Sequence, residues 1–200
     1  MGFTTIIDIL GSIIIGGILM TIAWRLSDAA TEKTYSNSGE LALQQNLATV
    51  AQIIEWDFRK IGYCADWNKL PDPSKAILLA DTSSLKFLTD VDADGTLDSI
   101  YYYLGPTSEL SATENPRDRV LYRVVNDETP APSNLGITRF YMVYYDALGY
   151  KINTPILKNF GEISSIEINV VVENVAAYNE KYSSAYWRQI RMVSRNLKNR

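Results

Sequence analysis

An apolar stretch near the start of the chain constrains its structure more than any other feature. It covers residues 3–24 and contains one charged residue, Asp8. About 20 mostly apolar residues are enough for a helix to span the hydrocarbon core of a bilayer. A cleaved secretory signal would instead need a basic region before the apolar run and small residues at a cleavage site after it, whereas Trp24 and Arg25 follow here. We therefore expect residues 1–25 to form a transmembrane helix.

Small residues and the single acid make this segment suited to helix packing. Gly11, Gly16 and Gly17, with Ser12, would allow two helices to approach closely in a membrane. Asp8 is costly in hydrocarbon, so we expect it either to lie at the membrane boundary or to pair with a cation, such as the N-terminal amine of another subunit. The resulting hypothesis is assembly through this helix.

A second helix is predicted over residues 26–62. Apolar residues recur there at steps of three or four, which is typical of a helix with one buried side. This stripe consists of Leu43, Leu47, Val50, Ile54, Phe58 and Ile61, and the opposite side carries Gln44, Gln45, Gln52, Glu55 and Arg59. We expect Gly62 to end the helix, and the polar run Ser-Asn-Ser-Gly at 36–39 to loosen or break its join to the membrane helix.

The remainder, residues 63–200, is predicted to form a β-rich head. Short runs of β-forming residues alternate there with Pro, Gly, Asn and Asp. The expected strands are 76–80, 85–89, 99–104, 120–125, 137–145, 163–173 and 186–194. In the sixth, Ile166, Ile168, Val170 and Val172 alternate with Glu167, Asn169 and Glu173, which predicts one buried and one solvent-exposed face. The expected fold class is α+β, with a long N-terminal helix packed on an antiparallel β-sheet head.

An acidic segment between the second and third expected strands is the clearest candidate binding site. Oxygen ligands stand at the first, third, fifth, seventh and ninth positions of a calcium loop: the side chains of Asp90, Asp92, Asp94 and Asp98, and the carbonyl of Thr96. Gly95 occupies the sixth position, and Tyr101 stands where the usual bidentate glutamate would be. The alternative is a β-hairpin in which Asp94 and Gly95 make a tight turn and the aspartates are merely solvated. The sequence alone does not decide between a Ca²⁺ site and a turn without a bound ion.

Composition excludes several classes of function. The chain has no histidine and one cysteine, Cys64, which removes the commonest general base and any internal disulfide. The net charge of −4 does not favour a nucleic-acid partner, and the tyrosines at 101–103 and 141–145 are interpreted as sheet packing residues. Glu55 and Asp57 could act as an acid/base pair, but nothing places them in a cleft. We do not expect an enzyme.

Three local stretches resemble the type IV filament family of pilins, minor pilins and type II secretion pseudopilins. Residues 2–10 read GFTTIIDIL, similar to the pilin start, in which a glycine precedes the cleavage point, a phenylalanine follows it and an acid lies about one turn into the helix. Residues 53–63, IIEWDFRKIGY, resemble the helix end of PilW-like minor pilins, and residues 194–200, SRNLKNR, resemble their final strand.

This resemblance implies a structural subunit of a pilus-like filament or pseudopilus. Its partners would be other copies or other pilin-like subunits, contacted through Phe3, Asp8, Gly11, Gly16 and Gly17. Its location would be the inner membrane with an extracytoplasmic head, and the cell surface after assembly. The alternative is a stand-alone, membrane-anchored binding module whose loop calcium stabilises. A tethered hydrolase that uses carboxylates is a third reading.

Overall fold

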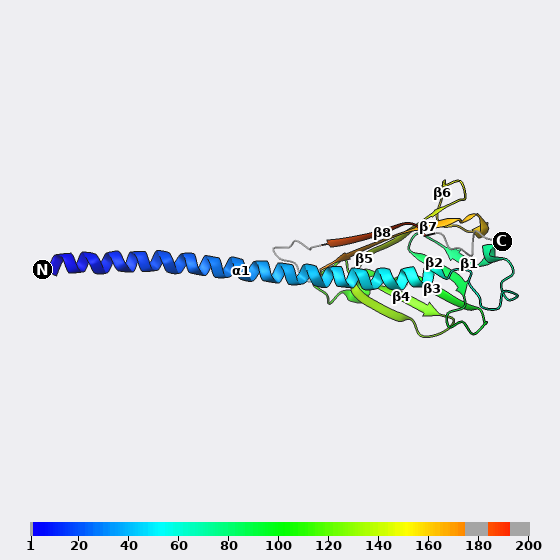
Figure 1. The fold of residues 1–200 in the computed structure, drawn as a ribbon, viewed down its shortest axis with the longest axis horizontal. Coiled ribbons are helices and arrows are strands. Elements are labelled where there is room, and N and C mark those ends of the chain that lie inside the picture. Colours follow the sequence, from blue (N-terminus) through cyan, green and yellow to red (C-terminus); the bar gives the residue numbers. More distant parts are fainter. Residues whose placement is uncertain (1, 175–183, 193–200) are drawn as a thin grey trace. The chain divides into compact units, whose positions relative to one another are not determined.

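The structure, a computed structural model, describes residues 2–174 and 184–192, with the backbone alone at 2–4 and 189–192. One long helix, α1 (Gly2–Arg59), precedes an antiparallel sheet (Figure 1). The chain divides into two units, Met1–Leu41 and Ala42–Arg200. The fold class expected from the sequence, α+β with an apolar N-terminal helix, is confirmed.

The first unit is the N-terminal part of α1. Its most apolar 18-residue stretch has a mean hydropathy of 2.3. The helix is therefore long and apolar enough to cross a membrane. No side chain over residues 5–41 is buried, and the large apolar ones are more than half exposed, among them Ile6, Ile9, Ile13, Leu19 and Trp24. Water is a poor solvent for such an apolar surface.

The expected break at 36–39 does not occur, because α1 remains helical through this run. A single glycine costs a helix only about 1 kcal/mol relative to alanine. The neighbouring hydroxyls bond within the helix: Ser38 Oγ donates to the Thr34 carbonyl at 2.9 Å, and Thr34 Oγ1 donates to the Ala30 carbonyl at 2.9 Å. These side chains therefore do not compete with the helical backbone for its amides.

The second unit begins with the C-terminal part of α1, whose predicted stripe is buried. Leu43, Val50, Ile54 and Phe58 lie in the core, and Leu47 packs against it. The helix ends at Arg59, three residues before Gly62, whose φ of 73° suits a residue without a Cβ.

The sheet has eight strands in the order β1-β2-β3-β4-β5-β7-β8, with β6 paired to β5. The strands are β1 (Ile77–Ala80), β2 (Ser84–Thr89), β3 (Asp98–Leu104), β4 (Arg119–Val125), β5 (Ala131–Tyr145), β6 (Lys151–Ile152), β7 (Ser165–Glu173) and β8 (Ser184–Met192). All named pairings are antiparallel, and consecutive strands are neighbours up to β5. Only β6 was not expected; the predicted strand 186–194 extends beyond the described residues at its end.

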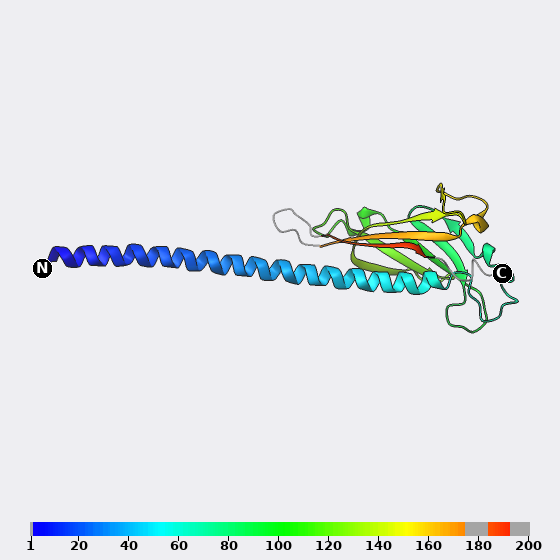
Figure 2. The same cartoon turned by 45° about the horizontal axis from the view of Figure 1, so that its top comes forward.

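The core lies between the sheet and the C-terminal part of α1. Residues 42–59 run along one face of the sheet (Figure 2). There Phe58 makes edge-to-face contacts with Phe87 on β2 and Tyr102 on β3, with ring centroids 5.6 and 5.5 Å apart. Ile54 is 0% exposed in the same cluster. The helix thus covers the apolar face that the alternating strands present.

The prediction that one face of β7 is exposed to solvent is wrong for the middle of the strand. Glu167 and Asn169 are buried, and only Glu173 at the strand end is half-buried. The reason is the position of β7 between β5 and β8, whose long polar side chains cover Glu167 and Asn169.

Replacing Ile54 with aspartate should unfold the head, because it puts a charge where no water reaches. We expect a loss of at least about 3 kcal/mol in unfolding free energy. Ile53, which is 45% exposed, supplies the matched control on the same helix. Thermal unfolding of the full chain in detergent should show a large fall for Ile54→Asp and a small one for Ile53→Asp. Equal losses would mean that the stripe is not the packing face.

Candidate functional site

The residues expected to mediate assembly lie on the exposed first unit. A Cβ built on Gly11, Gly16 or Gly17 would meet no atom within 4 Å, apart from the helix's own local backbone. Asp8 is exposed, and the side chain of Phe3 lies outside the described part of the chain. The glycines therefore have no packing role among the described residues.

Helix geometry narrows the small-residue face predicted from the sequence. Successive residues of an α-helix are about 100° apart, so residues four positions apart are separated by only about 40°. Asp8, Ser12 and Gly16 consequently form one row, and the Ser12 hydroxyl donates to the Asp8 carbonyl at 2.7 Å. Gly17 lies about 100° from Gly16, and Gly11 lies about 140° from it on the other side.

Three of the acidic residues, Asp90, Asp92 and Asp94, lie in the loop 90–97 between β2 and β3, and Asp98 is the first residue of β3. The last paired residues are Thr89 and Asp98, so Asp94 and Gly95 do not form a two-residue hairpin turn. The loop instead folds around the side chain of Asp90, which is 0% exposed. Its Oδ2 accepts the amide N–H groups of Ala65 and Gly95, each at 3.0 Å.

Three of the four aspartates come together. Single carboxylate oxygens of Asp90, Asp92 and Asp98 lie within 4.8 Å of one another. Asp94 lies outside this group, and its Oδ1 accepts the amide of Thr96 at 2.7 Å and the Thr96 hydroxyl at 2.5 Å. Within the group, Asp98 accepts the Val91 amide at 3.0 Å and Asn126 Nδ2 at 2.7 Å. The structure therefore retains three of the predicted ligand side chains at one point and directs Asp94 to the loop backbone.

Asp90 is held in its charged form. The amide of Ala65 lowers its pKa, burial opposes this, and the amides of Gly95, Ala93 and Asp94 lower the pKa further, so that it falls below the usual range. Asp90 Oδ1 is buried and has no hydrogen-bond partner within residues 2–174 and 184–192. Asp90 thus combines a negative charge with a buried oxygen whose bonding capacity is unused.

The carboxylates considered for acid/base chemistry serve the fold. Asp57 is buried and accepts the Tyr102 hydroxyl at 2.6 Å and Arg123 Nε at 2.6 Å. Glu55 points to Arg59 one helical turn away, at 3.5 Å. The two carboxylates are therefore not brought together as an acid/base pair.

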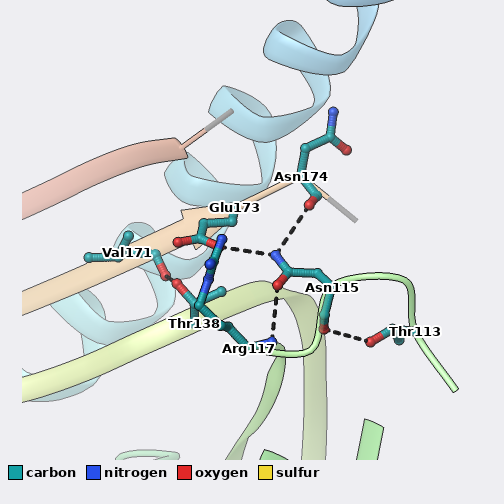
Figure 3. A network of polar contacts seen from close by, with 7 residues as sticks. All are labelled: Thr113, Asn115, Arg117, Thr138, Val171, Glu173 and Asn174. Carbon is teal, nitrogen blue, oxygen red and sulfur yellow. Dashed lines mark hydrogen bonds and ion pairs between the residues drawn. The ribbon is translucent and has the colours of Figure 1, made fainter. Parts of the chain in front are cut away.

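A polar network joins the loop before β4 to the end of β7 (Figure 3). Asn115 Nδ2 donates to Glu173 Oε2 at 3.1 Å and to the Asn174 carbonyl at 3.3 Å. Arg117 adds an ion pair to Glu173 at 2.7 Å. Close by, burial raises the pKa of Asp118. Sequence reasoning missed this network because its members are far apart in the chain and follow no local pattern.

A second network covers the outer face of β7. Glu167 Oε1 accepts Arg188 Nε at 2.9 Å and Asn169 Nδ2 at 3.1 Å, and its Oε2 accepts the Tyr145 hydroxyl at 2.9 Å. Burial opposes ionisation of Glu167, but Arg188, Asn169 and Tyr145 outweigh it and hold the pKa below its usual range.

Comparison with models of known protein families and with curated protein sequences finds no match to this chain.

The lowered pKa of Glu167 predicts a pH dependence of stability. A carboxylate with a lower pKa in the folded state stabilises the fold above its unfolded pKa of about 4.3, and this contribution is lost as pH falls through the folded pKa. Glu167→Gln should cost about 1 to 2 kcal/mol at pH 7 and should flatten the fall in melting temperature below about pH 5. Exposed Glu128, changed to Gln, is the control. Parallel pH profiles for Glu167→Gln and the parent would contradict the assignment.

Proposed function

We propose that this chain is the structural subunit of a type IV pilus-like filament or pseudopilus. It would assemble through the first unit of α1 with other copies or with other pilin-like subunits. The observation that carries this proposal is the exposed apolar surface of residues 5–41, none of whose side chains the described part of the chain buries. The same helix continues into the sheet-covered core of the second unit, which would attach each head to the assembly.

Two properties of the helix favour assembly over simple anchoring. An anchor needs only about 20 apolar residues and no acid within them. Here Asp8, Ser12 and Gly16 share one row, in which the glycine would allow a neighbouring backbone to approach and the acid would select a cationic partner. The N-terminal amine of an adjacent subunit is the nearest such cation in a staggered stack.

The proposed location follows from the same reasoning. Before assembly the helix would lie in the inner membrane with the head on the extracytoplasmic side, and after assembly the head would be displayed on the cell-surface filament. No catalytic role is proposed, because Glu55 and Asp57 are engaged in separate ion pairs. A stand-alone anchored binding module remains the outcome to be tested against assembly.

Asp8→Ala and Gly16→Leu should each abolish filaments while leaving a folded, membrane-inserted protein. The first removes the charge that would set the register, and the second pushes the helices apart. Gly17→Leu, with the same added volume about 100° away, is the matched control and should reduce assembly less. The measurement is recovery of sheared surface filaments alongside membrane-bound protein. Parental levels of filaments from both Asp8→Ala and Gly16→Leu would mean that the helix is only an anchor.

A further inference from the structure

We infer that the loop between β2 and β3 binds one Ca²⁺ through Asp90, Asp92 and Asp98, and that the ion fixes this loop to the segment that follows α1. This inference does not depend on the filament proposal. It rests on the convergence of three carboxylates within 4.8 Å and on a buried oxygen of Asp90 that has no hydrogen-bond partner in the part of the chain that the structure describes.

The buried oxygen is the feature that calls for a cation. Asp90 is 0% exposed, and two amide N–H groups already occupy its Oδ2. Its Oδ1 is buried and accepts no hydrogen bond from the described residues. A buried carboxylate oxygen in this condition is unfavourable unless a positive charge lies against it. One carboxylate oxygen from each of Asp90, Asp92 and Asp98 lies within 4.8 Å of the others, so the three residues could share one cation.

The ligand chemistry selects a hard cation of calcium's size. Carboxylate oxygens suit Ca²⁺ and Mg²⁺, but Mg²⁺ demands a near-ideal octahedron and gives up its waters reluctantly. Ca²⁺ accepts six to eight oxygens in irregular geometry, so three carboxylates with water and carbonyl oxygens form a reasonable shell. Asp92 is exposed and leaves a path from solvent, whereas Asp90 forms the buried floor of the site.

The contacts around the loop show what the ion would hold together. The Asp90 amide donates to the Tyr63 carbonyl at 2.8 Å, and Lys60 Nζ donates to the Val91 carbonyl at 3.0 Å. The Thr89 hydroxyl donates to the Lys60 carbonyl at 2.9 Å. Neutralising the three carboxylates would remove their repulsion at this junction and make it more resistant to unfolding.

The structure also supplies an internal control. Sequence spacing makes Asp94 a ligand equal to the others, whereas in the fold its carboxylate is turned to Thr96. Asp92 and Asp94 are both exposed loop residues, so exchange of either for asparagine should leave the fold intact. Comparing Asp92→Asn with Asp94→Asn therefore distinguishes the ligands that the structure brings together from those that the sequence motif predicts.

The experiment is calorimetric titration of Ca²⁺ into the full chain, purified in detergent and first stripped with chelator, together with its melting curve. The parent should bind one ion and melt several degrees higher in millimolar Ca²⁺ than in chelator. Asp92→Asn and Asp98→Asn should weaken binding by about tenfold or more, and Asp94→Asn by less than about threefold. Mg²⁺ at the same concentration should raise the melting temperature less.

Two results would overturn the inference. The first is a parent that gives no binding heat and melts identically in Ca²⁺ and in chelator. The second is a weakening by Asp94→Asn equal to that of Asp92→Asn, which would show that the three-carboxylate cluster does not define the site. Circular dichroism of each variant checks that any lost binding is not lost folding.

Discussion

The structure depends on one helix that must satisfy two different environments. In the second unit, the stripe that contains Ile54 and Phe58 is sealed against the sheet, and Phe58 contacts aromatic rings on two strands. Without that stripe, the apolar face of the antiparallel strands would be open to water. In the first unit, the same helix presents apolar side chains that the described residues leave uncovered. The apolar stripe of the second unit is thus covered from within the chain, and on our proposal other subunits would cover the apolar surface of the first unit.

Several buried or half-buried acids of the head are held by a cation or by hydrogen bonds. Asp57 has Arg123 and Tyr102, Glu167 has Arg188 and two further donors, and Glu173 pairs with Arg117. These pairs join residues distant in sequence and so fix which strands and loops lie together. Asp90 and Asp118 differ from these acids. Backbone amides occupy one oxygen of Asp90 and nothing in the described structure occupies the other, and neither oxygen of buried Asp118 has a hydrogen-bond partner among the described residues. Of the two, only Asp90 belongs to a described group of three carboxylates that could hold a metal ion, which is why the acidic loop supports a cation proposal.

Much of the fold could be predicted because periodicity is a local property of the sequence. The steps of three and four from Leu43 to Phe58 identify the buried stripe, and β-forming runs between turn residues locate every strand except the two-residue β6. The failures involve information that is not local. Glu167 is buried because β8 lies beside β7. The carboxylate of Asp94 accepts hydrogen bonds from Thr96 and lies outside the group that Asp90, Asp92 and Asp98 form, which the spacing of the aspartates does not reveal. The helix continues through 36–39 because one glycine costs too little to interrupt it.

The central claim is that residues 5–41 of α1 pack against other subunits. Cryo-electron microscopy of filaments sheared from cells that make the parental chain tests it most directly. The account predicts a central bundle of these helices, with the β-sheet heads outside it and Asp8 within hydrogen-bond distance of a cationic group on a neighbouring subunit. Filaments that lack this chain, with the protein recovered only as separate membrane-bound copies whose helices are surrounded by lipid, would contradict it.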